Sequence, residues 1–150
     1  MADHFAQQIF DAVVTASTGL TTTGANVYQQ RVFNVPSDVN YALSIAFGEE
    51  ELLGDYGYSN TRFVDADLTI NITIHVREAD GSLDQKLSQI RKELYIALMA
   101  NYNLNLNFVH MIMPGNTSEA DVSAANVPTL SCQTSWKVRY RHSLTDPSIL

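Results

Sequence analysis

Residues with side chains capable of catalysis are few and lie far apart in the chain. The only cysteine, Cys132, falls within an alternating apolar stretch. A thiol nucleophile needs a base within hydrogen-bond reach, and no histidine lies at a local spacing that would supply one. We therefore expect Cys132 to be a small buried hydrophobic residue. The four histidines stand singly, at His4, His75, His110 and His142.

No catalytic or cofactor motif is present. The chain contains no glycine-rich phosphate loop, no His-Glu-x-x-His zinc pattern and no nucleophile elbow. His75 and His110 fall on predicted strands and could meet across a sheet, but single strand histidines are more typical of a surface or a hydrogen-bonded core. An enzyme would need convergent polar groups in an apolar pocket. We therefore expect no enzymatic activity, no metal and no cofactor.

The first charged segment that could contact a partner is 48–63 (GEEELLGDYGYSNTRF), sixteen residues with no clean hydrophobic period. Loops of this length in a compact domain are usually functional. We interpret the segment as an exposed hairpin extension, with a solvated loop as the alternative. A metal site is disfavoured because consecutive glutamates on an extended chain cannot all face one ion. The candidate contact residues are Glu49, Glu50, Glu51, Tyr56, Tyr58 and Arg62.

The second charged segment lies near the C-terminus, where Lys137, Arg139 and Arg141 alternate with apolar residues. On a strand they project from one face at intervals of about 7 Å. The row is either a solvated outer face or an ion-pair row that meets an acidic segment such as 49–51 of a neighbour. A nucleic-acid reader would interleave aromatic and basic residues on the same face. Here the aromatic residues fall on the opposite face, so we expect no nucleic-acid recognition.

The element that must organise these residues is the stretch 66–77 (ADLTINITIHVR). Its apolar and polar residues alternate strictly, and many are β-branched, which predicts a half-buried strand. A helix pattern follows from Ser82, with apolar residues at helical spacing. Strand and helix together should supply most of the core.

We predict a single α+β domain over 1–150, with long loops at 48–63 and 114–128. The sheet should be mostly antiparallel, with about five strands and two helices packed on one face. The predicted order is α-β-β-β-α-β-β. The elements are a helix over 3–17 capped by Asp3, strands at 27–33, 41–47 and 66–77, a helix from 82 to about 101, and strands at 104–113 and 130–141.

The chain is acidic, with nine basic residues, sixteen acidic residues and a net charge of −7. Ten of the acidic residues lie between Asp38 and Asp84. A nucleic-acid-binding protein would present a broad basic face, so this charge favours an oppositely charged neighbour, or a wall that DNA passes without binding. Apolar runs fall well short of the ~20 residues of a membrane span, and no secretory signal pattern opens the chain. We expect a soluble protein of the cytoplasm in which it is made.

The order of parts resembles a family of phage proteins. It runs from RVFNVPSDVNYALSIAFGEEE to DLTINITIHVRE, then to SLDQKLSQIRKELYIALM, and closes on SWKVRYRHSLTDPS. This series resembles the minor tail and tail-terminator proteins of long-tailed bacteriophages, the lambda-like class. The closing pattern, Tyr140-Arg141 followed by Asp146-Pro147, carries most of the resemblance.

The resemblance implies a non-enzymatic virion protein that forms a homo-hexameric ring at the head-proximal end of the tail. Such a ring ends polymerisation of the tail tube protein and joins the tail to the head connector or neck protein. DNA would only pass through its lumen as cargo, and no membrane would be involved. The protein would be assembled in the host cytoplasm and located in the virion tail or neck. A head-completion protein of the neck and a monomeric ligand-binding module remain alternatives.

Overall fold

The computed structural model describes residues 3–29, 35–36, 38–54, 62–78, 82–123 and 127–150. Two predictions fall outside these residues: the contact roles of Tyr56 and Tyr58, and the later part of the strand at 27–33.

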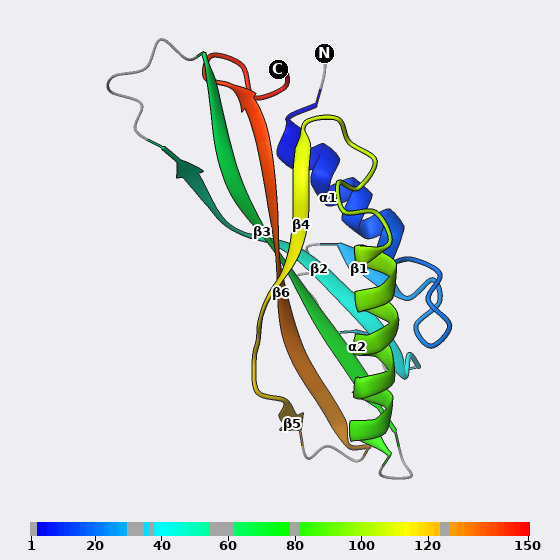
Figure 1. The fold of residues 1–150 in the computed structure, drawn as a ribbon. Coiled ribbons are helices and arrows are strands. Elements are labelled where there is room, and N and C mark those ends of the chain that lie inside the picture. Colours follow the sequence, from blue (N-terminus) through cyan, green and yellow to red (C-terminus); the bar gives the residue numbers. More distant parts are fainter. Residues whose placement is uncertain (1–2, 30–34, 37, 55–61, 79–81, 124–126) are drawn as a thin grey trace.

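Both helices pack on one face of the sheet, as predicted, and the sheet has six strands rather than about five (Figure 1). The strands lie side by side in the order β1-β2-β3-β6-β4, with β5 also pairing with β6. All strand pairs are antiparallel except β1 with β2. The prediction of an α+β fold with a mostly antiparallel sheet is therefore confirmed, although the one parallel pair makes the sheet mixed. The elements are α1 (Phe5–Ser17), β1 (Val27–Gln29), β2 (Tyr41–Leu53), β3 (Phe63–Arg77), α2 (Leu83–Met99), β4 (Val109–Thr117), β5 (Asp121–Ser123) and β6 (Thr129–Ser143).

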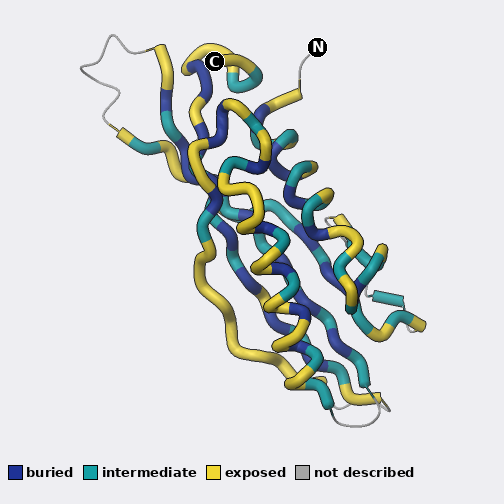
Figure 2. The backbone as a smooth tube through the Cα atoms, turned by 45° about the vertical axis from the view of Figure 1, so that its right-hand side comes forward, coloured by how far each residue is buried: buried dark blue, intermediate teal, exposed yellow. Residues whose placement is uncertain are grey.

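The core lies between the sheet and the inner sides of the helices (Figure 2). On β3, alternate residues from Val64 to Val76 are buried, and the same alternation on β6 faces the same way. Burying each large aliphatic side chain here contributes about 1.5–3 kcal/mol. The helix residues that close this core are Ile9, Phe10, Val13, Ile90, Leu94 and Leu98.

The segment 48–63, predicted as a long loop and interpreted as an exposed hairpin extension, is a hairpin extension at its described ends, because β2 continues to Leu53 and pairs antiparallel with β3, which begins at Phe63. A register shift between Phe47 and Glu50 inserts extra residues into β2. This bulge breaks the period of two that identifies a strand in a sequence. Gly48 suits the bulge, since a Cβ there would lie 2.9 Å from the Asn71 side chain.

The strand predicted at 104–113 is shifted in the structure. Leu104 and Asn105 have positive φ angles of 55° and 57°, so the chain turns there and β4 begins at Val109. The strand then continues through Pro114 to Thr117, where a loop was predicted. Proline is tolerated because β4 lies at the sheet edge, where a missing backbone N–H breaks no ladder. A further short strand, β5, occupies part of the predicted 114–128 loop.

The helix starts agree closely with the sequence prediction. His4, rather than Asp3, caps α1, and its Nδ1 accepts a hydrogen bond from the Ala6 N–H at 2.9 Å. Ser82 occupies the N-cap position of α2, as predicted. Neither of the helices described has the length and apolar character that a membrane crossing requires.

Candidate interaction surface

The face of the sheet turned away from the helices is lined by polar residues. They alternate with the core residues of the two longest strands, and no helix in the described part of the chain covers them (Figure 1). Ser135 Oγ donates to Asn71 Oδ1 at 3.0 Å, so these side chains satisfy one another. The residues that line this open face are Thr69, Asn71 and Thr73 of β3 and Ser131, Gln133 and Ser135 of β6.

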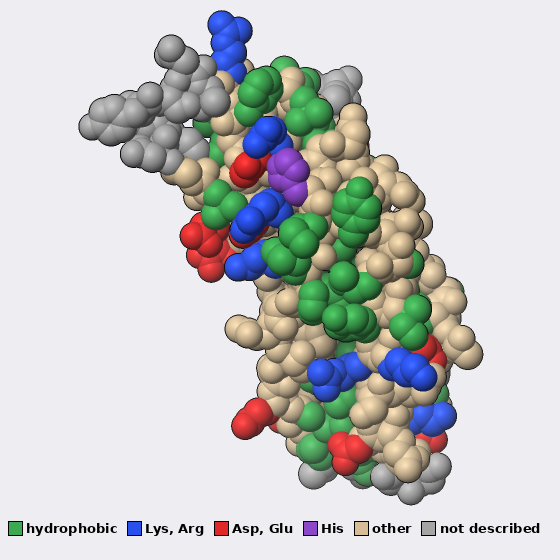
Figure 3. Space-filling view, in the orientation of Figure 1, with side chains coloured by type: hydrophobic (Ala, Val, Ile, Leu, Met, Phe, Trp, Pro, Cys, Tyr) green, Lys and Arg blue, Asp and Glu red, His purple; other side chains and the backbone are tan. Residues whose placement is uncertain are grey.

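Two arginine–aspartate pairs cross from β6 to β3 on the open face. Arg139 Nε and Nη2 donate to Asp67 Oδ1 and Oδ2 at 2.8 and 2.9 Å. Arg141 donates to Asp65 in the same way, at 2.8 and 3.1 Å. Such two-point contacts fix the orientation of both partners. Figure 3 shows basic, acidic and histidine side chains gathered in this upper part of the molecule.

The two aspartates are held in their charged form. The hydrogen bond from Arg139 lowers the pKa of Asp67, against the opposing effect of burial. The bond from Arg141 lowers the pKa of Asp65, again against burial, and His110, whose Nε2 lies 3.2 Å from Asp65 Oδ1, lowers it further. The Asp67 side chain is 5% exposed and that of Asp65 31%. Solvent therefore screens the Asp67 pair less than the Asp65 pair.

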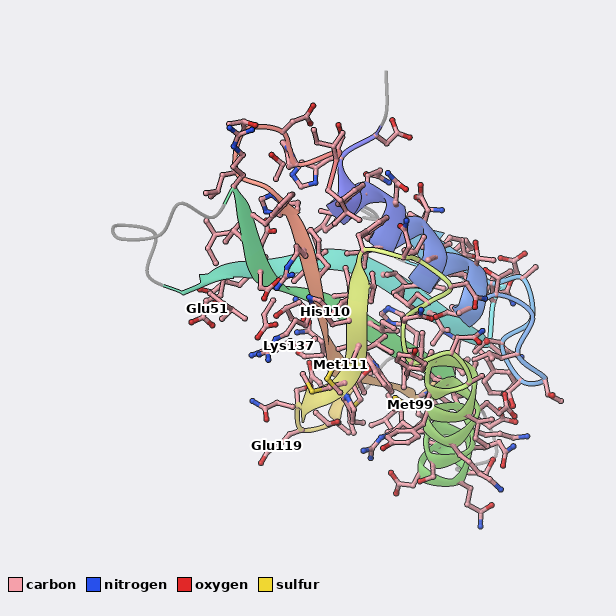
Figure 4. The ribbon with its side chains drawn as sticks, turned by 45° about the horizontal axis from the view of Figure 1, so that its top comes forward. Glu51, Met99, His110, Met111, Glu119 and Lys137 are labelled. Carbon is pink, nitrogen blue, oxygen red and sulfur yellow. The ribbon has the colours of Figure 1, made fainter. Side chains whose placement is uncertain are left out.

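The predicted basic row does lie on one face of β6. Arg139 and Arg141 are engaged by aspartates of their own chain, whereas Lys137 forms no ion pair with any described residue. Figure 4 shows Lys137 and Glu51 on the side of the sheet away from the helices. Contact between this row and a neighbouring subunit stays a prediction, and Lys137 is the member whose charge is available for it.

The three glutamates of the acidic segment do not share one environment. Glu50 accepts a hydrogen bond from the hydroxyl of buried Tyr140, and burial together with this carboxylate raises the pKa of Tyr140. Glu49 and Glu51 are exposed and form no ion pair within the described ranges. Arg62 is also exposed, beside the start of β3, and its carbonyl accepts an N–H of the C-terminal tail at 2.8 Å. The segment therefore offers two unpaired carboxylates rather than three.

Charged side chains that form no ion pair with a described residue lie toward both sides of the sheet. β1 pairs with β2 only at residues 43–45, so the 49–53 end of β2 has no described neighbour on its outer side. On the opposite side, β4 pairs only with β6. Lys137 and Arg91 lie next to β4, near Pro114. Carboxylates and cations that form no ion pair with a described residue therefore lie toward opposite sides of the sheet, although exposed Glu119 and Asp121 also lie on the β4 side.

β4 bows away from β6 at Pro114 and Gly115. The register shifts between Pro114 and Thr117, and a Cβ on Gly115 would lie 2.8 Å from the Ser135 carbonyl oxygen. Glycine permits this close backbone approach because it has no Cβ. The bend leaves a hollow on each face of the sheet: about 180 Å³ against α2, and about 370 Å³ on the open face.

The hollow against α2 contains an unpaired donor that the sequence analysis missed. Trp136 lines this hollow and also the one on the open face, is 3% exposed, and its indole Nε1 has no hydrogen-bond partner among the described residues. The Tyr95 ring lies beside it, with 5.6 Å between ring centroids. Exposed Arg91 also lines the hollow. In the sequence, the only feature that marks this bend is a Pro-Gly pair in a segment with no clear hydrophobic period.

Exposed apolar side chains lie near this hollow, over the outer side of α2 and the following turn. In Figure 3, hydrophobic side chains gather below the charged group. Grouped apolar exposure of this kind is typical of a contact surface. The exposed residues are Tyr95, Ile96, Met99, Tyr102 and Met111.

His75 and His110 do not meet across the sheet, in agreement with the expectation that the strand histidines stand singly. His75 lies 3.2 Å from Ser44 Oγ, and burial lowers its pKa. His110 contacts Asp65, ten residues away from His75 along β3. Cys132 is free and buried, as predicted. Among the residues that the structure describes, no three His, Cys, Asp or Glu side chains are placed to hold a metal ion.

No protein-family model matches this chain, and no curated protein matches it. One similar solved structure, whose name gives no function, is 14% identical over 91% of this chain and 92% of its own length, with a TM-score of 0.49. Another is the sheath/tube terminator, in the extended state, of the extracellular contractile injection system PVC. It is 16% identical over 96% of this chain, with a TM-score of 0.45, and this chain spans 58% of its length. At these levels of identity and TM-score, neither likeness carries an argument about function.

Proposed function

We propose that this chain is a non-enzymatic structural subunit of a phage tail. Its copies assemble head-to-tail into a closed ring that ends tube polymerisation at the head-proximal end and joins the tail to the head connector. The proposal combines the resemblance of the sequence with the distribution of charge. The observation that carries it is the contrast between carboxylates at the end of β2 and cations beside β4, neither of which forms an ion pair with a described residue.

A closed ring of identical subunits needs two different surfaces on each subunit that complement each other. Glu49 and Glu51 on one side of the sheet, and Arg91 and Lys137 on the other, meet this condition. A two-fold dimer would instead need a patch that complements itself. The charge distribution therefore favours head-to-tail association.

The acidic excess of the chain suits an inner surface past which DNA moves without binding. In this proposal the tail tube protein lies against one end of the ring and the neck protein against the other. The number of subunits, six, is taken from the resemblance.

Two alternatives make different predictions. A head-completion protein would form a ring nearer the portal, without an effect on tube growth. A monomeric ligand-binding module would need a larger site, since small-molecule pockets usually measure about 300–1,000 Å³. The described hollows measure about 180 to about 420 Å³, so the two larger ones reach only the lower end of that range.

Electron microscopy of the chain added to growing tail tubes tests the proposal. A tail terminator should appear as a ring at one end of each tube, and tube length should stop increasing after it is added. Rings that form without stopping tube growth would favour the head-completion protein. Tubes that neither carry a ring nor stop growing would contradict the proposal.

A further inference from the structure

The hollow between α2 and the bend of β4 has the chemistry of a carboxylate site. Its buried indole N–H of Trp136 can only donate a hydrogen bond, and Arg91 supplies a positive charge beside it. The Tyr95 ring adds an apolar wall. A buried donor without a partner costs about 1–3 kcal/mol. An anionic acceptor that carries a short apolar stem would remove this cost and pair with the guanidinium.

The size of the hollow narrows the choice of occupant. At about 180 Å³ it lies below the range of small-molecule sites, about 300–1,000 Å³. It is better matched to a single side chain. A glutamate side chain has both an apolar stem and a terminal carboxylate, which can accept a hydrogen bond from Trp136 and pair with Arg91.

We propose that this hollow receives a glutamate from residues 49–51 of a second copy of the chain. The inference rests on the ring proposed above and assigns its contact. Those residues are the only run of three consecutive acidic residues in the sequence. Glu49 and Glu51 are exposed and unpaired within the described ranges, and they lie on the side of the sheet opposite β4. An acidic segment on one side can therefore reach the basic hollow of the next subunit around a ring.

Lys137 lies on the open face of the same bend, beside the larger hollow. Cations therefore stand on both faces of the β4 edge at Pro114 and Gly115. Successive side chains of a strand point to opposite faces, so Glu49 and Glu51, two positions apart on β2, project from one face, opposite to Glu50. Glu50 is held by Tyr140 within its own chain, which leaves Glu49 and Glu51 for the contact.

The single tryptophan makes the test direct. Labelling tryptophan with a nitrogen isotope gives one indole N–H resonance in NMR spectra, that of Trp136. On ring formation, followed in parallel by native mass spectrometry, this resonance should move downfield as the N–H gains a charged acceptor. Arg91→Glu and the double variant Glu49→Arg/Glu51→Arg should each weaken ring association by at least about tenfold. Mixing the two variants should restore association, because each supplies the charge that the other lacks.

Matched controls carry the same charge changes elsewhere. Lys92→Glu reverses the neighbouring basic residue, which does not line this hollow. Glu119→Arg/Asp121→Arg reverses two exposed acidic residues on the β4 side. Both controls should associate like the wild type, and circular dichroism should show that every variant is folded. Arg91→Ala serves as a second variant if Arg91→Glu does not fold.

Two different results would overturn the inference. The first is that rings form, the indole resonance does not move, and the rings persist in Arg91→Glu and Arg91→Ala. No glutamate would then occupy the hollow, while the proposed ring itself would stand. A wild-type chain that stays monomeric at every concentration, with and without tail tubes, would overturn the inference and the proposed function together.

Discussion

Asp67 and Arg139 face each other across β3 and β6, joined by two hydrogen bonds of 2.8 and 2.9 Å. Asp65 and Arg141 repeat the arrangement two residues along each strand. The two pairs neutralise most of what the sequence shows as a basic strand face. The charges available to a partner are consequently those outside the pairs, Lys137 among them.

Asp67→Asn should lower the free energy of unfolding near neutral pH. Because Arg139 holds the folded-state pKa of Asp67 below its ordinary value of 3.8, the pair stabilises the fold above that value. This contribution is lost as the pH falls through the lower folded-state pKa. Urea unfolding between about pH 7 and pH 2 should show that acidification lowers the free energy of unfolding less in the variant than in the wild type. Asp65→Asn is the control and should have the smaller effect, because Asp65 is more exposed. Identical pH profiles for wild type and Asp67→Asn would contradict the pairing.

Arg139→Glu should destabilise the monomer itself. It would place a carboxylate against the buried Asp67, and a buried charge without a partner is costly. Lys137→Glu, on the same face of the same strand, should leave the free energy of unfolding within about 0.5 kcal/mol of the wild type. Thermal unfolding of the two variants checks this difference. Equal stability losses would mean that the pair of Asp67 and Arg139 does not stabilise the monomer as described. With the expected difference, only Lys137→Glu tests assembly without also destabilising the monomer.

Tyr140→Phe should lower the free energy of unfolding by about 1 kcal/mol, since it removes one hydrogen bond while keeping the buried ring. The effect should be modest because exposed Glu50 can turn to water. Urea unfolding measures it. Glu50→Gln, which keeps an acceptor, is the matched control and should lose less. A loss of several kcal/mol would show that the Tyr140 hydroxyl has a role beyond this bond.

Gly115→Ala should destabilise the β4 edge. A Cβ there would lie 2.8 Å from the Ser135 backbone oxygen, and backbone atoms cannot move aside as a flexible side chain can. The expected loss is about 1–3 kcal/mol, as for other overpacked sites. Asn116→Ala, at the next and exposed position, should be near neutral. Hydrogen exchange of β4 amides would localise the effect. Unchanged protection in Gly115→Ala would contradict the close approach.

Strict alternation explains why the centre of the fold could be predicted from the sequence. β3 and β6 keep a period of two over the predicted spans 66–77 and 130–141, and α2 keeps apolar residues at helical spacing, so these spans and their inner faces are correct, although both strands extend beyond them. Each error lies where a local feature breaks the period. The bulge at Gly48 concealed the end of β2, and the positive φ angles at Leu104 and Asn105 moved the start of β4.

The candidate site was predictable only in its residue types. The sequence placed Arg139 and Arg141 on one strand face, but it could not show which strand lies beside them. The partners Asp65 and Asp67 follow from the pairing of β3 with β6, a tertiary property. The unpaired indole of Trp136 depends in turn on how α2 packs beside the bend of β4, which no spacing in the sequence reports.

Native mass spectrometry of the wild-type chain tests the central claim most directly. It should cover a wide concentration range at low and moderate salt, alone and with polymerised tail tubes. The account predicts one discrete closed ring, of six copies by the resemblance, that weakens as salt screens its charged contacts. A chain that remains a monomer or forms only a two-fold dimer under all of these conditions, tail tubes included, would contradict it.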